Sequence, residues 1–276
     1  MTTSAASTNL LSDTAYWAAA LRAAESEHPR GLLRDPFARL LSGQRGAELV
    51  GSASGDLRRW AVVMRTCLFD ELIEMGVREG ADTVLNLGAG FDTRPYRLEL
   101  PESLRWIEVD LPEVLACKQE ALRKEVPRCR VERCPGDLSD SDTRRALIAQ
   151  ATREARRVLV VTEGVMVYFC EAEAAALADD LVAAEGVWRW VQEMVSPQVL
   201  DVLRGTMGAT LRGAAAALRF APLNGPEFFA SRGWRIRQLR SLIDHPGCVE
   251  RFPFVPRLFG RDDPPRPWSG MCVLEK

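Results

Sequence analysis

The chain has 276 residues, of which 47% are hydrophobic, and its formal net charge is −2. This length and composition suffice for a large core and exclude a disordered chain. The near-neutral charge excludes the basic surface that sequence-independent nucleic-acid binding requires. The seven cysteines form no CxxC pair and have no Cys/His partner set, so we expect no metal site and a cytoplasmic location. We also expect neither a signal peptide nor a membrane partner, because no stretch reaches the ~18–20 apolar residues of a membrane span.

Helical patterns fill the first part of the chain. They run from Leu10 to about Glu79, and Asp35-Pro36 is typical of a helix start, with Asp35 as the N-cap. The glycine-rich break Gly51–Gly55 precedes a long helix predicted over about Leu57 to Arg78. We therefore expect residues 1–80 to form a helical cap or lid.

From Ala81, short apolar runs alternate with helical stretches, which indicates a parallel sheet with helical crossovers. After Ser196-Pro197 the pattern predicts an Ala-rich helix from Gln198 to about Arg219. The sequence thus predicts an α/β fold whose core spans residues 81–276, with a helical insertion at about 197–232. The predicted strands are TVLNL (83–87), RWIEVD (105–110), RVERC (130–134), RVLVV (157–161), WRWVQEM (188–194), GWRIRQLRSL and WSGMCVLEK.

The turn Gly88-Ala89-Gly90 follows the first of these strands, and glycines there permit a close approach to a ligand. We expect Asp92 and Thr93 to cap the helix that follows. Asp110 ends the second strand, where an acid binds ribose hydroxyls in doubly wound folds. These features alone leave a dinucleotide open. However, Thr93 stands where a dinucleotide fingerprint has Gly or Ala, and the neighbouring acid Asp92 would repel a pyrophosphate. The turn therefore favours S-adenosylmethionine, which has no phosphate; a turn that binds no ligand is the alternative.

Arg65 is a second candidate for a cofactor contact. Its neighbours on one helix face are all apolar: Ala61, Val62, Leu68, Phe69 and Leu72. A buried cation needs a partner, since an unpaired charge costs several kcal/mol. A cofactor carboxylate, a structural acid or solvent reached by an extended side chain would each satisfy Arg65.

Several longer segments carry a resemblance to a known family. NLGAGFDTRPYRL, WIEVDLPEVLACK and VTEGVMVYF are similar to the leucine carboxyl methyltransferase family, and in particular to its bacterial polyketide O-methyltransferases, of which the tetracenomycin carboxyl methyltransferase is one. TAYWAAALRAAESEHPRGLLRDPFARLL and PWSG extend the likeness over most of the chain. The resemblance implies a class I, Rossmann-like methyltransferase fold, with a seven-stranded mixed sheet whose last strand is antiparallel.

The resemblance also implies roles for individual residues. Arg65 would pair with the carboxylate of S-adenosylmethionine, Asp110 would bind its ribose, and Glu163 would face its amino-acid end. Asp137 and Leu138 would read the adenine, although Asp137 is equally understood as a turn acid after Gly136. The predicted cofactor-binding set is Arg65, Gly88, Ala89, Gly90, Asp110, Leu111, Asp137, Leu138 and Glu163.

The acceptor site is less marked in the sequence. Tyr168 and His245 are the catalytic candidates, against packing for Tyr168 and an ordinary loop position for His245. Tyr16, Arg204 and Arg212 are candidates for acceptor binding, with Tyr16 and its neighbours alternatively part of the core. Because an ionised carboxylate needs no base, we expect O-methylation of a small natural-product acceptor, with a carboxylate ahead of a phenol. A nucleotide-dependent oxidoreductase and a non-catalytic cofactor-binding protein are the alternatives, and a homodimer stays open.

Overall fold

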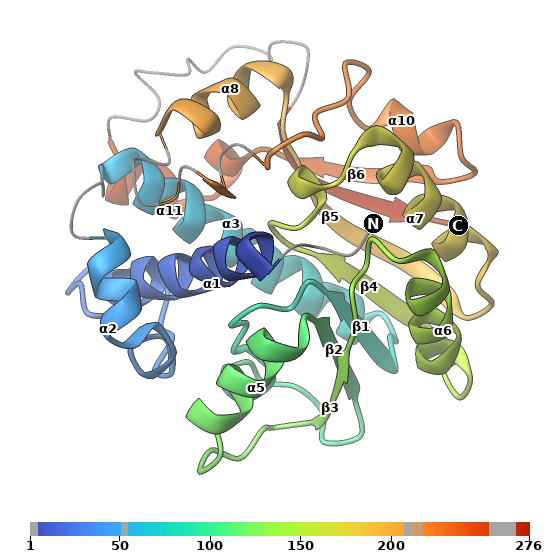
Figure 1. Ribbon diagram of the computed structural model, residues 1–276, viewed down its shortest axis with the longest axis horizontal. Helices are drawn as coiled ribbons and strands as arrows, with labels where there is room; N and C mark the ends of the chain where they lie inside the picture. Colours follow the sequence, from blue (N-terminus) through green and yellow to red (C-terminus); the bar gives the residue numbers. More distant parts are fainter. Residues whose placement is uncertain (1–4, 51–54, 207–210, 212, 215–216, 254–268) are drawn as a thin grey trace.

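The computed structural model describes residues 5–50, 55–206, 211, 213–214, 217–253 and 269–276. A seven-stranded sheet in the order β3-β2-β1-β4-β5-β7-β6 runs through the molecule (Figure 1). Neighbouring strands from β3 to β5 are parallel, and β7 is antiparallel to both β5 and β6. The strands are β1 (Thr83–Leu87), β2 (Arg105–Asp110), β3 (Arg130–Pro135), β4 (Val158–Thr162), β5 (Val187–Met194), β6 (Arg235–Arg240) and β7 (Gly270–Glu275). The predicted fold class is confirmed.

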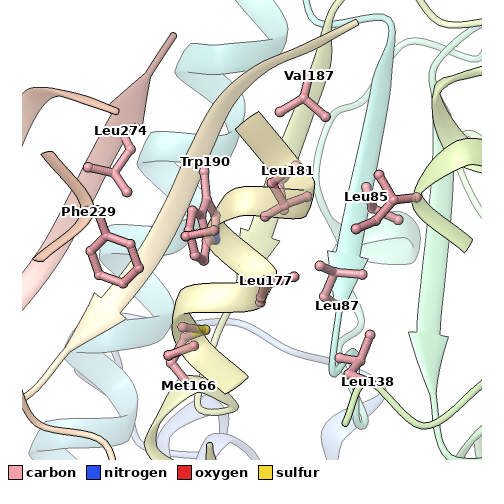
Figure 2. Packing of buried hydrophobic residues seen from close by; sticks show 14 of the residues in the cluster. Leu85, Leu87, Leu138, Met166, Leu177, Leu181, Val187, Trp190, Phe229 and Leu274 are labelled. Carbon is pink, nitrogen blue, oxygen red and sulfur yellow. The ribbon is translucent and has the colours of Figure 1, made fainter. Parts of the chain in front are cut away.

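The sheet is covered on both faces, which explains why its central strands β1 and β4 are buried along their whole length and mostly apolar. In β1, Leu85 and Leu87 pack against the side that carries α6 (Ser141–Thr152) and α7 (Glu171–Ala183), whereas Val84 packs on the side of α3 (Asp56–Arg78). Figure 2 shows the first of these cores, where Trp190 of β5 has Phe229 on one side and Leu177, which belongs to α7, on the other. The Trp190 and Phe229 rings meet edge to face at 5.1 Å.

Two helices precede α3 and pack against each other: α1 (Ala5–Ser26) and α2 (Ala38–Val50) (Figure 1). A buried cluster joins Ala19 of α1 and Leu41 of α2 to Phe91 and Tyr96, and to α5 (Pro112–Ala121) through Val114. The α-helix begins at Ala38 and not at Pro36, because Pro36 and Phe37 form a turn. Asp35 caps this turn as predicted: its Oδ1 accepts from the N–H of Phe37 at 3.2 Å, while its Oδ2 pairs with Arg22. Helices α1 and α2 therefore rest on the segment that follows β1.

The remaining elements are short. They are α4 (Arg94–Arg97), η1 (Met166–Tyr168), α8 (Pro197–Thr206), α10 (Glu227–Ala230), η2 (Leu242–Asp244) and α11 (Gly247–Arg251). The Ala-rich helix predicted from Gln198 to about Arg219 corresponds to α8 as far as Thr206. Between residues 206 and 217 only 211, 213 and 214 are described, so most of the remaining prediction lies outside the described residues. Among the described helices, none combines the length and apolarity that crossing a membrane would require.

Candidate functional site

A cavity lies at the carboxyl ends of β1, β2 and β4, where the order of the strands reverses direction. This is the position at which open α/β sheets bind ligands. All nine residues of the predicted cofactor-binding set line it, together with Tyr168. Its walls come from α1 (Thr14, Ala15, Trp17, Ala18, Arg22), α3 (Arg65, Thr66), β1 with the loop and α4 that follow it (Asn86, 88–92, Arg94, Arg97), the end of β2 and the segments after β2 and β3 (Asp110, Leu111, Val114, 136–138) and the segment after β4 (163–165, Tyr168, Phe169).

The glycine loop forms the floor of this cavity. Gly88 and Gly90 have φ values of 72° and 46°, which L side chains rarely adopt. A Cβ at Gly88 would lie 2.7 Å from Cγ2 of Val165, so no side chain fits there. The backbone N–H groups of Gly88 and Ala89 donate to the carbonyl of Val109 at 2.8 and 3.0 Å, which ties the loop to β2. The loop thus leaves a backbone surface that a ligand can approach.

Asp110 is oriented by the backbone around it. Its Oδ2 accepts from the N–H of Gly90 at 2.6 Å and its Oδ1 from the N–H of Leu111 at 2.7 Å. Burial raises the pKa of Asp110, although the hydrogen bonds from Gly90 and Leu111 work against that rise. Each carboxylate oxygen can accept more than one hydrogen bond, so Asp110 can also accept from ribose hydroxyls.

Asp137 and Leu138 lie side by side at the cavity wall. Oδ1 of Asp137 accepts from the N–H and the hydroxyl of Ser139 at 2.9 and 2.7 Å, which is the geometry of a turn acid. The carbonyl of Leu138 accepts from Nη1 of Arg144 at 3.0 Å. Turn formation and ligand contact are therefore compatible for Asp137, and its adenine contact stays a prediction.

Arg65 is held by two carboxylates of the protein. Its Nε donates to Glu163 at 2.9 Å and its Nη1 to Glu193 at 3.1 Å. The second oxygen of Glu163 lies 2.7 Å from Nη1 of Arg94. Burial opposes the ionisation of Glu163, but the charges of Arg94 and Arg65 outweigh it and lower the pKa of this carboxyl. Of the partners considered for Arg65, the structure thus provides structural acids, and the guanidinium still borders the cavity.

Both Asp92 and Thr93 were expected to cap α4, and only the side chain of Asp92 does so. Oδ1 of Asp92 accepts from the N–H of Arg94 at 2.9 Å, so Asp92 caps α4. Thr93 occupies the N-cap position, but its hydroxyl donates to Asp35 at 2.8 Å and makes no capping bond, which corrects the prediction for its side chain. Burial acts against ionisation of Asp92, yet the charge of Arg94 prevails and lowers the pKa of Asp92 to about 2.

The acceptor candidates are scattered. Tyr168 lines the cavity and its hydroxyl bonds to Thr14; burial raises its pKa. Tyr16 is not a lining residue: its ring meets Phe91 at 4.7 Å, and burial, together with the nearby Cys117, raises its pKa to about 12. Arg204 bonds to Asp201 and to the carbonyl of Leu218.

His245 and Arg212 complete the acceptor candidates. His245 is not a lining residue, and its Nε2 lies 3.5 Å from Glu71 on α3. Arg212 lies outside the described residues.

Sequence reasoning missed two charged residues at or beside this cavity, Arg94 and Glu193, and treated Arg22 only as part of a lid or of the core. Arg22 bonds to Asp35 at 3.0 Å and to the carbonyl of Phe91 at 2.7 Å, which connects α1 to the glycine loop. Arg94 is 2% exposed and joins three acids. Glu193 had a signal in the sequence, since it is an acid at the carboxyl end of a buried strand.

Comparisons with known proteins give a consistent result. The family model for leucine carboxyl methyltransferase matches residues 15–182. A candidate S-adenosyl-L-methionine-dependent methyltransferase of Frankia alni is 35% identical over 167 residues, which are 56% of this chain and 58% of that relative. A second one from the same organism is 31% identical over 82% of this chain and 84% of the relative. One from Streptomyces coelicolor is 33% identical over 74% and 73%.

The first relative is therefore matched over less than two thirds of its length, and the other two over more. Among solved structures, a DUF574 family protein from Streptomyces avermitilis has a TM-score of 0.58 and 16% identity, and the match covers 94% of this chain and 96% of that one. This likeness shows the fold.

Proposed function

We propose a reaction for this chain, which belongs to the leucine carboxyl methyltransferase family: transfer of a methyl group from S-adenosylmethionine to an oxygen atom of a small-molecule acceptor. The family supports S-adenosylmethionine as the cofactor, and a nucleotide-dependent oxidoreductase is set aside for the same reason. Within the family we favour a carboxylate acceptor over a phenol, and a polyketide or other natural product as the molecule that carries it.

The cavity fits this cofactor. Gly88 and Gly90 line the cavity with backbone alone, and Asp110 stands at the ribose position of doubly wound folds. We assign Asp110 to the ribose hydroxyls, Asp137 and Leu138 to the adenine, and Arg65 and Glu163 to the carboxylate and ammonium groups. When bound, the cofactor supplies an electrophilic methyl group on a positively charged sulfur.

The protein's part in the reaction is to position the acceptor and exclude water. Trp17, Val165, Tyr168 and Phe169 give the cavity an apolar wall that can do both. Positioning of this kind supplies about 7–11 kcal/mol of a reaction barrier. We propose that α1 and α2 act as the lid, because α1 contributes Thr14, Trp17 and Arg22 to the wall and α2 packs on α1.

The ionisable groups of the cavity carry the preference for a carboxylate. The pKa values of Glu163 and Asp92 are lowered, so both are weak bases, and the pKa of Tyr168 is raised, so it stays protonated at neutral pH. Both histidines of the chain are described, and neither lines the cavity. Asp110 is the lining carboxyl whose pKa burial raises, and we assign it to the ribose. A phenol would need a base that the other residues do not offer, whereas a carboxylate is already ionised.

The pH dependence of the rate tests this preference. With a carboxylate acceptor, kcat/KM should be nearly flat between about pH 6 and 8.5, because an acceptor of pKa about 4 is ionised throughout. His245→Ala should keep most of the activity, since His245 lies off the cavity. A rate that climbs through the histidine pKa and collapses in His245→Ala would overturn the carboxylate preference and leave methyl transfer intact.

A further inference from the structure

A network of buried charges borders the cavity beside the glycine loop, and we call it the arginine network. Its members are Arg65, Arg94, Arg97, Asp70, Asp92, Glu163 and Glu193, and every one is connected to another by an ion pair of 3.1 Å or less. Three cations and four anions make its formal charge −1. Because its members are largely buried, solvent screens this charge little.

The surplus charge belongs to Glu193. Arg97 bonds to both oxygens of Asp70 at 2.6 and 2.7 Å, and Arg94 pairs with Asp92 at 2.9 Å. Glu163 lies between Arg65 and Arg94, with one oxygen on each. Glu193 is paired, within the described part of the chain, with Arg65 alone, which already serves Glu163. The Glu193 side chain is only 14% exposed, so water hydrates its negative charge incompletely. Arg65, which Glu193 shares with Glu163, neutralises that charge only in part.

The surrounding charges do not cancel this surplus. Arg22 and Asp35 form a neutral pair at 3.0 Å. Lys118 and Arg133 share Glu108, which leaves one positive charge, and the nearby carboxylate of Asp110 balances it. Asp137, which also lines the cavity, adds one further negative charge, so the formal charge across these groups is −2. A ligand with one positive charge therefore suits the cavity better than a neutral ligand of the same shape.

The cofactor of the proposed reaction and its demethylated product differ in net charge. Attack by the acceptor oxygen forms the oxygen–carbon bond and breaks the carbon–sulfur bond, whose electron pair stays on sulfur. S-adenosylmethionine carries a sulfonium, an ammonium and a carboxylate, a net charge of +1, and its demethylated product, S-adenosylhomocysteine, has a net charge of zero. Product release and cofactor loading thus exchange a neutral ligand for a cationic one.

We propose that Glu193 is a specificity-determining residue that favours the cationic cofactor over its neutral product. The proposal rests on the proposed function only for the identity of the cofactor. Two unit charges separated by roughly 10 Å in a medium of effective dielectric constant about 20 attract by an amount that changes a binding constant on the order of tenfold. Glu193 reduces product inhibition by this mechanism, without contacting the reacting atoms.

Calorimetric titration of the full-length protein with each ligand tests the proposal. In Glu193→Gln, the affinity for S-adenosylmethionine should fall on the order of tenfold, and that for S-adenosylhomocysteine should stay nearly constant. Glu193→Asp keeps the charge and should keep the ratio of the two affinities. Glu74→Gln is the matched control, because it removes one negative charge from an exposed pair with Arg78 on the same side of the sheet.

Three results would overturn the proposal: an equal loss of both affinities in Glu193→Gln, which would mean that Glu193 only orients Arg65; no change of either affinity in that variant; or the same change in Glu74→Gln. If Glu193→Gln does not fold, the wild-type protein decides the matter. An analogue with a protonated amine in place of the sulfonium should then bind about tenfold more tightly than the product, and equal binding would refute the role of charge. Failure of wild-type protein to bind either ligand would instead refute the proposed function.

Discussion

Arg65 lies between Glu163 and Glu193 and borders the cavity, so its removal affects both binding and stability. Arg65→Ala leaves Glu193 without its cation and should lower the free energy of unfolding by about 3 kcal/mol. It should also abolish detectable binding of S-adenosylmethionine at a temperature where the variant is folded. Arg65→Lys keeps the charge but not the planar fork that reaches two acids, so affinity should fall at least about tenfold.

Titration calorimetry measures these affinities, and circular dichroism verifies folding. Arg78→Ala is the control, since Arg78 lies on the same helix, 69% exposed, and pairs with Glu74 at 3.8 Å. It should change neither quantity. Unchanged affinity in Arg65→Ala would mean that Arg65 is purely structural.

At the scale of an element, the contact between α1 and the glycine loop depends on Arg22. This side chain and its partner Asp35 are 10% and 0% exposed, and Arg22 also binds the carbonyl of Phe91. Arg22→Met strands a buried carboxylate and should cost about 3–5 kcal/mol of unfolding free energy. Arg39→Met breaks an exposed pair with Glu27, with side chains 56% and 58% exposed, and should cost at most about 1 kcal/mol. Urea unfolding of both variants measures the loss of unfolding free energy in each. Equal losses would contradict the role of Arg22 in holding α1 to the glycine loop.

For the whole molecule, the cavity couples ligand binding to stability, because its walls come from α1, α3 and the ends of three strands. A ligand that binds only the folded state at 100 times its Kd adds about 2.7 kcal/mol to the free energy of unfolding. For a chain of this size that raises the Tm by roughly 5–10 °C. Thermal unfolding with S-adenosylmethionine should show this shift, and NAD should show none. An equal shift with NAD would contradict the assigned cofactor.

Local patterns were enough to predict the sheet and the glycine loop. TVLNL and RWIEVD are β1 and β2, residue for residue, because strands covered on both faces are short and bury mostly apolar side chains, such as Trp106, Ile107 and Val109 of β2. The positions of Gly88, Gly90 and Asp110 at the carboxyl ends of these strands follow directly, since a parallel sheet brings such ends to one edge. The resemblance to a methyltransferase family then indicated what the loop binds.

The pairing of charges could be decided only by the tertiary structure. Arg65 lies 98 residues from Glu163 and 128 from Glu193, and no periodicity in the sequence relates α3 to the ends of β4 and β5. The same holds for Tyr16 and His245, which the fold places off the cavity. By itself the sequence determined which segments form strands and which turn lies at a ligand site, because backbone conformation and burial leave local patterns. The ion pairs that set the charge of the cavity depend on how distant elements cross, and only the folded chain establishes those crossings.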